Sequence, residues 1–84
     1  MFFLGIDIAK HNHVASLIDD NGNSIFKACS FSNSSNGADS LIDKLKKYST
    51  DDIIIGMEAT GHYWLALYSY LSEKDFNIIV INPI

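Results

Sequence analysis

The chain has 84 residues, of which 48% are hydrophobic, 19% charged and 12% aromatic. This composition fits one compact domain over residues 1–84 and argues against both disorder and a second domain. No apolar run approaches the roughly 20 residues of a membrane-spanning helix, and no basic residue precedes the first apolar run as in a signal peptide. Six lysines and no arginine stand against ten acidic residues, and the net charge of −4 argues against a free-standing nucleic-acid-binding module.

The number of cysteines indicates the redox state of the compartment in which the protein is expected. The single cysteine, Cys29, permits neither an internal disulfide nor a cysteine-based metal site. A reducing cytoplasm is therefore the expected location, and Cys29 itself is expected in the core.

The first part of the chain predicts three strands. Residues 2–9 are almost continuously apolar, which is typical of a strand covered on both faces, and Asp7 is the exception. Residues 13–19 and 24–31 flank an Asp-Asn-Gly-Asn segment, in which Asn-Gly supplies the positive φ angles of a tight turn, so we expect a hairpin. The polar stretch at 30–37 is expected to be a loop.

The second part predicts two helices. Apolar residues recur at helical spacing over 38–48, and Asn36 is positioned to cap the first turn. A second helix is expected over 62–73 with Thr60 as its N-cap. Its apolar stripe includes Trp64 and Tyr68, which are therefore expected in the core.

Two more strands alternate with these helices. Residues 52–58 and 77–81 are apolar runs that read as fully buried strands, and the first of them ends on a lone carboxylate, Glu58. The order β-β-β-α-β-α-β predicts an α/β fold. Three antiparallel strands are followed by two right-handed crossovers, which gives a mixed five-stranded sheet with helices against it.

Two acidic residues stand out because they interrupt apolar strands, Asp7 in the first and Glu58 at the end of the fourth. A buried carboxylate persists when it is neutralised, hydrogen-bonded or bound to a metal. If the first and fourth strands are neighbours, the two side chains can share a divalent cation, and oxygen ligands favour Mg²⁺ or Mn²⁺. The alternative is that each acid lies at a strand end, exposed or satisfied by backbone amides.

Other polar residues carry weaker indications. Lys10 follows the first strand, where it could contact a phosphate or simply be a solvated charge. Thr60 and Gly61 open the predicted second helix, whose amide groups could hold a phosphate or be capped by the threonine. The three histidines, His11, His13 and His62, form no tight two-ligand motif and do not predict a metal site.

Three segments carry a family resemblance: Gly5-Ile6-Asp7-Ile8-Ala9-Lys10, Glu58-Ala59-Thr60-Gly61 and Val80-Ile81-Asn82-Pro83. In order and approximate spacing they resemble the amino-terminal domain of the DEDD transposases of the insertion sequence 110 family. The resemblance covers nearly the whole chain. It implies a RuvC-like, ribonuclease H-like fold and a transposase that recombines DNA with four acidic residues binding Mg²⁺ or Mn²⁺. It also implies that a structured RNA guides the choice of target.

The resemblance assigns two of the four acids. Asp7 matches the first and Glu58 the second, whereas the other two family aspartates lie downstream of the Asn-Pro segment and this chain ends at Ile84. Asp19 and Asp20 are in the wrong element to replace them, and we expect them to shape the hairpin turn. The resemblance therefore implies the leading part of a catalytic domain, truncated at its carboxy end and inactive by itself.

Two other functions stay open. An ATP-binding domain of the actin and sugar-kinase type has a similar topology and first strand, but it needs a glycine-rich turn after the aspartate, and Ala9-Lys10-His11-Asn12 has no glycine. The other is a non-catalytic module that assembles into homo-oligomers through apolar surface. Aromatic residues expected near such a contact are Tyr63, Tyr70 and Phe76.

Overall fold

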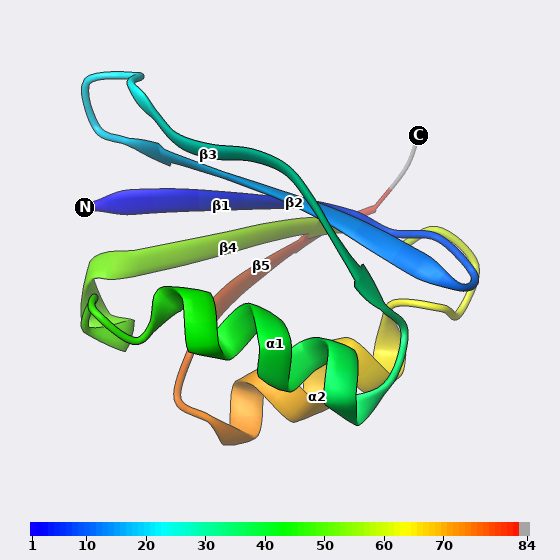
Figure 1. Ribbon diagram of the computed structural model, residues 1–84. Coiled ribbons are helices and arrows are strands. Elements are labelled where there is room, and N and C mark those ends of the chain that lie inside the picture. Colours follow the sequence, from blue (N-terminus) through cyan, green and yellow to red (C-terminus); the bar gives the residue numbers. More distant parts are fainter. Residues whose placement is uncertain (83–84) are drawn as a thin grey trace.

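A computed structural model describes residues 1–82, in which five strands form one mixed sheet and two helices lie against it (Figure 1). The elements in chain order are β1 (Phe2–Asp7), β2 (Asn12–Asp19), β3 (Ser24–Ser32), α1 (Ser35–Leu45), the short 3₁₀ helix η1 (Thr50–Asp52), β4 (Ile53–Glu58), α2 (Leu65–Glu73) and β5 (Asn77–Ile81). The spatial order is β3-β2-β1-β4-β5. Strands β1, β2 and β3 pair antiparallel, and β4 pairs parallel with both β1 and β5. The predicted α/β fold class is confirmed.

Both helices cover the same face of the sheet, where the core lies (Figure 1). Alternate residues of β1 and β4 point into the core, because successive side chains of a strand face opposite sides of the sheet. Leucines at helical spacing on α1 and α2 complete the layer. The fully or almost fully buried members are Leu4, Ile6, Ile53, Ile55 and Met57 on the strands and Leu41, Leu45, Leu67 and Leu71 on the helices.

The other face of the sheet has no covering layer within residues 1–82. Phe3 is 39% exposed and Ile79 is 55% exposed, so the prediction that these strands are covered on both faces is wrong for the described chain. Apolar side chains occupy both faces, and the sequence run alone therefore cannot separate a covered face from an open one. As a result, Asp7 and Glu58 are exposed rather than buried.

The hairpin is confirmed, but its turn differs in detail from the prediction. Gly22 has a φ of 84° and Asn21 is not in the left-handed region, so one residue supplies the positive φ rather than two. The Asp19 carboxylate accepts hydrogen bonds from the backbone amides of Asn21 and Asn23, both at 2.9 Å. These hydrogen bonds, that of Asn23 foremost, lower the pKa of Asp19. Asp19 therefore shapes the turn, as expected from its position.

Helix α1 begins earlier than predicted. Its N-cap is Ser34, whose hydroxyl accepts from the amide of Gly37 at 3.1 Å, and not Asn36. Most of the stretch at 30–37 therefore belongs to β3 or α1 and is not a loop. The entry to the helix is tight, because a side chain at Gly37 would collide with the backbone carbonyl of Ser32.

Helix α2 begins later than predicted. Residues 61–64 form a turn, in which Gly61 has a φ of 59°, and the N-cap is Trp64 without a side-chain hydrogen bond. Thr60 is therefore not the helix cap. Trp64 packs against the core, but Tyr68 is 37% exposed, so the prediction of a core position is wrong for Tyr68.

The structure also gives the positions of Cys29, Tyr70 and Phe76. Cys29 is partly buried on β3. Tyr70 donates a hydrogen bond from α2 to the Asp39 carboxylate on α1 at 2.6 Å, and this contact raises the pKa of Tyr70. Phe76 is buried in the core, so the prediction that it contributes to an exposed contact surface is wrong.

Candidate functional site

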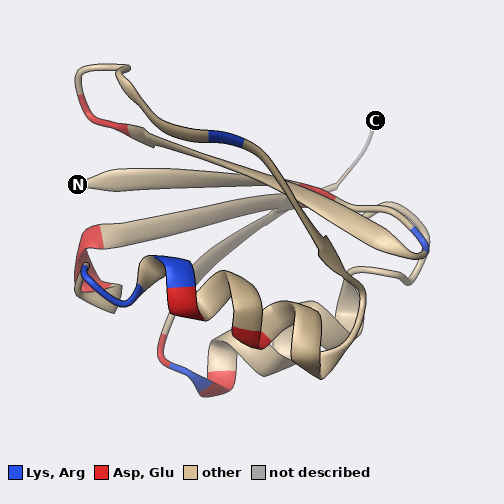
Figure 2. Cartoon of the chain, in the orientation of Figure 1, with Lys and Arg blue, Asp and Glu red and all other residues tan. Residues whose placement is uncertain are grey.

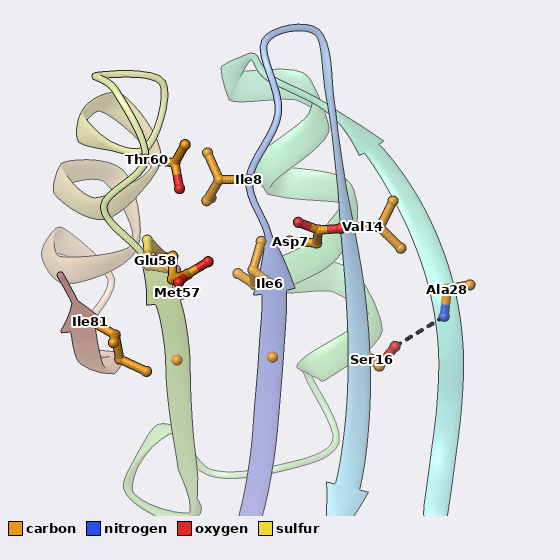
Figure 3. Close-up of a pocket in the computed structure, with 12 residues that line it drawn as sticks. Ile6, Asp7, Ile8, Val14, Ser16, Ala28, Met57, Glu58, Thr60 and Ile81 are labelled. Carbon is orange, nitrogen blue, oxygen red and sulfur yellow. Dashed lines mark hydrogen bonds between the residues drawn. The ribbon is translucent and has the colours of Figure 1, made fainter. Parts of the chain in front are cut away.

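Asp7 and Glu58 end the adjacent parallel strands β1 and β4. The parallel register pairs Ile6 of β1 with Met57 of β4, and one further step along both strands brings Asp7 level with Glu58. Because the carboxyl ends of parallel strands meet at the same edge of a sheet, the two side chains come from neighbouring positions. Figure 3 shows both on the open face, where they line one pocket. The structure thus brings together the two acids that the sequence singled out.

The pocket is a shallow depression of about 610 Å³. Asp7 and Glu58 are its only charged lining residues within the described chain, and no hydrogen bond or ion pair to either carboxylate is found among residues 1–82. Both are open to solvent ions. The remaining lining residues are apolar, small or hydroxyl-bearing: Gly5, Ile6, Ile8, Val14, Ser16, Ala28, Gly56, Met57, Thr60 and Ile81.

The donor set fits part of a divalent-metal site. Two carboxylates on adjacent strands are hard oxygen ligands of the kind that Mg²⁺ and Mn²⁺ prefer. A group of three or more histidine, cysteine or acidic side chains that could hold a metal is absent from the part of the chain that the structure describes. Asp7 and Glu58 therefore provide two ligands, and further ligands have to come from water, substrate or additional chain.

The three other candidate residues separate in space. Thr60 lines the pocket beside Glu58 (Figure 3). Lys10 lies in the loop between β1 and β2, where its carbonyl accepts a hydrogen bond from the Asn33 side chain at 3.2 Å, and it does not line the pocket. Gly61 lies in the turn before α2 and accepts from the indole of Trp64. Because α2 begins only at Leu65, the amides at 60–61 are not those of a helix N-terminus.

His13 is a residue whose role sequence reasoning missed. It is fully buried, unlike exposed His11, and its Nδ1 accepts the backbone N–H of Ala9 at 3.1 Å. Nε2 therefore carries the proton, and it has no partner within the described residues. Ala9 follows Asp7 by two positions. The hydrogen bond to His13 therefore fixes the loop that begins directly after Asp7. The sequence signal that could have indicated the burial of His13 is its spacing of two from Ala15 on β2, since such residues share one face of a strand.

Ser16 is a second missed residue. Its hydroxyl oxygen accepts from the amide of Ala28 at 3.1 Å, and it lines the pocket below Asp7 (Figure 3). Ala28 has a φ of 49°, unusual for a residue with a side chain, at an irregularity in the β2–β3 register. Nothing in the sequence around Ala28 indicates a bulge.

Within residues 1–82 the charged side chains are scattered and form no continuous basic face. The lysines lie on β3, on α1, just after each helix and in the β1–β2 loop (Figure 2). Four of them have a local partner. Lys46 pairs with Asp43 at 3.0 Å. Lys44, Lys47 and Lys74 lie over the rings of Phe26, Tyr48 and Tyr70, respectively. Neither helix in residues 1–82 has the length and apolar character needed to cross a membrane.

Comparison with known proteins gives concordant matches. The family model of the DEDD transposases of insertion sequence 110, described as a transposase, matches residues 4–84. The pilin gene-inverting proteins of Moraxella lacunata and Moraxella bovis are each 30% identical over 84 residues. Each match covers 98% of this chain and 25% of the relative, so the chain spans about a quarter of the length of these curated relatives. Of the Asn82-Pro83 motif, Pro83 lies outside the described residues.

Proposed function

Because the chain belongs to the DEDD transposase family of insertion sequence 110, we propose that it forms the leading part of the catalytic domain of a DNA transposase. In this proposal, Asp7 and Glu58 are two of the metal-binding acids for DNA strand cleavage and transfer. The observation that supports it most directly is their position, level with each other on adjacent parallel strands and lining one pocket. The names of the Moraxella relatives, which invert a pilin gene, also favour DNA as substrate.

The chemistry assigns each residue a part. We expect the two carboxylates to lie about 4–7 Å apart when they hold Mg²⁺ or Mn²⁺, since paired cations in such sites are about 3.5–4 Å apart. A bound divalent cation would polarise the scissile phosphate and stabilise the leaving oxygen. Thr60 can offer a hydroxyl to a phosphate oxygen at the mouth of the pocket. Lys10 and Gly61, outside the pocket lining, would contact more distant phosphates.

The partners belong to the same proposal. DNA is the expected substrate. A guide RNA follows from the family alone, whereas assembly into a homo-oligomer is expected from the exposed apolar surface. With a net charge of −4 and dispersed lysines, the 84 residues provide little attraction for a polyanion, so basic segments elsewhere in a longer protein would hold the nucleic acid. The kinase-type alternative gains no support, because the loop after β1 contains no glycine.

Divalent-metal titration of the 84-residue chain tests this function. We expect Mn²⁺ to broaden the backbone NMR signals around Asp7 and Glu58 first, with an affinity of at best about millimolar, because only two ligands are present. Asp7→Asn and Glu58→Gln should each weaken binding by roughly tenfold or more. Asp51→Asn is the matched control, since this exposed acid lies in η1, before the opposite end of β4.

Two results would contradict the proposal. One is Mn²⁺ binding by the Asp7→Asn/Glu58→Gln double variant that equals that of the unmodified chain. The other is robust DNA cleavage by the 84-residue chain, because it would show that two acids suffice and that the four-acid assignment is wrong.

A further inference from the structure

Two exposed rings lie in the turn between β4 and α2. His62 and Tyr63 are both exposed, Tyr63 by 37%, whereas the next residue, Trp64, packs against the core. The rings of His62 and Tyr63 lie against each other, with their centroids 5.1 Å apart and their planes tilted by 46°. Packing of the core within residues 1–82 therefore does not account for this pair.

The backbone that carries the pair is held on both sides. Before the turn, the amide of Ala59 donates to the carbonyl of Ile81 at 2.9 Å, so the chain stays bonded to β5 directly after Glu58. At the end of the turn, the indole of Trp64 donates to the carbonyl of Gly61 at 3.2 Å. The two exposed rings are thus presented by a fixed turn.

The ring of Tyr63 lies close to the pocket of the two acids. A Cβ atom added at Gly61, which has a φ of 59°, would lie 3.9 Å from Cδ2 of Tyr63. Thr60 directly precedes Gly61 and lines the pocket that Asp7 and Glu58 share (Figure 3). The ring therefore lies against the residue that follows the pocket lining.

The segment around the pair carries no acidic residue and no lysine over residues 59–72. A phosphate group is held mainly by cationic side chains, which this segment lacks. Aromatic rings stack on the faces of nucleobases, and this contact needs no charge. The turn thus offers the chemistry for a base rather than for a phosphate.

We propose that Tyr63, with His62 beside it, stacks on an unpaired base of the DNA strand whose phosphate is held at Asp7 and Glu58. This inference rests on the proposed function, because the strand has to be bound at the pocket for the next nucleotide to reach the turn. The base has to leave the duplex, since neighbouring bases cover its faces there. Tyr63 fixes the position of the strand without reading its sequence, because every base has a face on which a ring can stack.

A protein partner is the alternative occupant of the turn. Leu65 and Tyr68 on the following helix are also exposed, by 49% and 37%. A protein seated on the turn would cover the side of the pocket that Thr60 lines and obstruct the DNA. The two occupants also differ in what they require, because a base stacks on a planar ring, whereas an apolar protein contact also accepts leucine.

The test measures how the 84-residue chain binds a short single-stranded oligonucleotide with one 2-aminopurine base, in the presence of Mg²⁺. The fluorescence of this base falls when it stacks, so the unmodified chain should quench it. Tyr63→Leu should weaken binding by about 5- to 30-fold, the effect of losing one stack between a base and an aromatic ring. Tyr63→Phe should bind within about twofold of the unmodified chain, because it keeps the ring.

Three controls separate the stack from other effects. Tyr68→Leu should bind like the unmodified chain, since Tyr68 is exposed to the same extent as Tyr63 but lies on α2. An oligonucleotide with abasic sites in place of its bases should bind equally to all variants. Without DNA, Mn²⁺ should broaden the signals around Asp7 and Glu58 equally in Tyr63→Leu and in the unmodified chain. A failed metal site is therefore told apart from a failed stack.

Photocrosslinking covers the case in which this acidic chain binds too weakly for titration. An oligonucleotide with 5-iododeoxyuridine should crosslink to Tyr63 or His62, as mapped by mass spectrometry. The proposal is overturned if Tyr63→Leu binds as tightly as the unmodified chain, if it loses the same affinity for the abasic oligonucleotide, or if crosslinks form only outside residues 60–64. An unmodified chain that gives neither quenching nor crosslinks overturns it as well.

Discussion

Several polar side chains of this molecule accept hydrogen bonds from backbone amides in turns and loops. The Asp19 carboxylate holds two amides of the hairpin turn, Ser34 holds the first turn of α1, and buried His13 holds the amide of Ala9. Each of these hydrogen bonds pairs a backbone N–H group that would otherwise have to bond to water. The loops are therefore fixed by local contacts, and the carboxylates of the pocket are left free for other partners.

Replacing Asp19 should have an effect that depends on pH. Its hydrogen bonds hold the pKa of Asp19 below the ordinary value of 3.8, so the stabilisation is fully present above that value and is lost as the pH falls through the lowered pKa. Asp19→Ala should therefore lower the stability at pH 7, and its deficit relative to the unmodified chain should be smaller at about pH 2. Urea unfolding at both values measures this.

Asp20→Ala is the control for this experiment. Asp20 lies in the same turn, and within residues 1–82 it pairs only with the amino terminus, at 3.8 Å. This exposed ion pair contributes little to stability. An Asp19→Ala deficit that is equally large at both pH values would contradict the assignment.

At the scale of elements, the ends of the helices were harder to predict than their existence. The spacing of Leu41 and Leu45 indicated α1, but Ser34, Ser35 and Asn36 are all good caps, and sequence alone does not choose among them. For α2, Thr60 looked like a cap, whereas the left-handed Gly61 inserts a turn before the helix begins. Boundaries depend on such single backbone angles, which composition does not determine.

Removal of the α1 cap tests this choice. Ser34→Ala should destabilise the chain by about 1 kcal/mol, because the amide of Gly37 loses its acceptor. Ser35→Ala should change the stability by less than about 0.5 kcal/mol, since Ser35 is an exposed first-turn residue. Thermal unfolding of the two variants measures the difference, and equal losses would mean that the cap lies elsewhere.

At the scale of the whole molecule, the mixed five-stranded sheet and the order of its elements along the chain were predictable, and the open face was not. Hairpin signals and alternating helices and strands predicted three antiparallel strands followed by two crossovers. The structure adds the spatial order β3-β2-β1-β4-β5. The same reasoning singled out Asp7 and Glu58, because acids are rare in apolar strands. It treated them as buried, since an apolar run looks the same whether its second face is covered within the chain or by something else.

The parallel pairing of β1 with β4 has a consequence for how the molecule folds. The hairpin of β2 and β3 closes with a short turn. Strand β1 can pair with β4 only when a long loop, which contains β2, β3, α1 and η1, brings residues such as Phe2 and Ile53 together. Closing a loop of this length costs conformational entropy, which slows the pairing of residues so far apart in the sequence. Asp7 and Glu58 therefore come together only when this long loop has closed. If Asp7 and Glu58 bind Mn²⁺ as proposed, Mn²⁺ binding during refolding should appear no earlier than the pairing of β1 with β4, and binding that precedes this pairing would contradict the assignment.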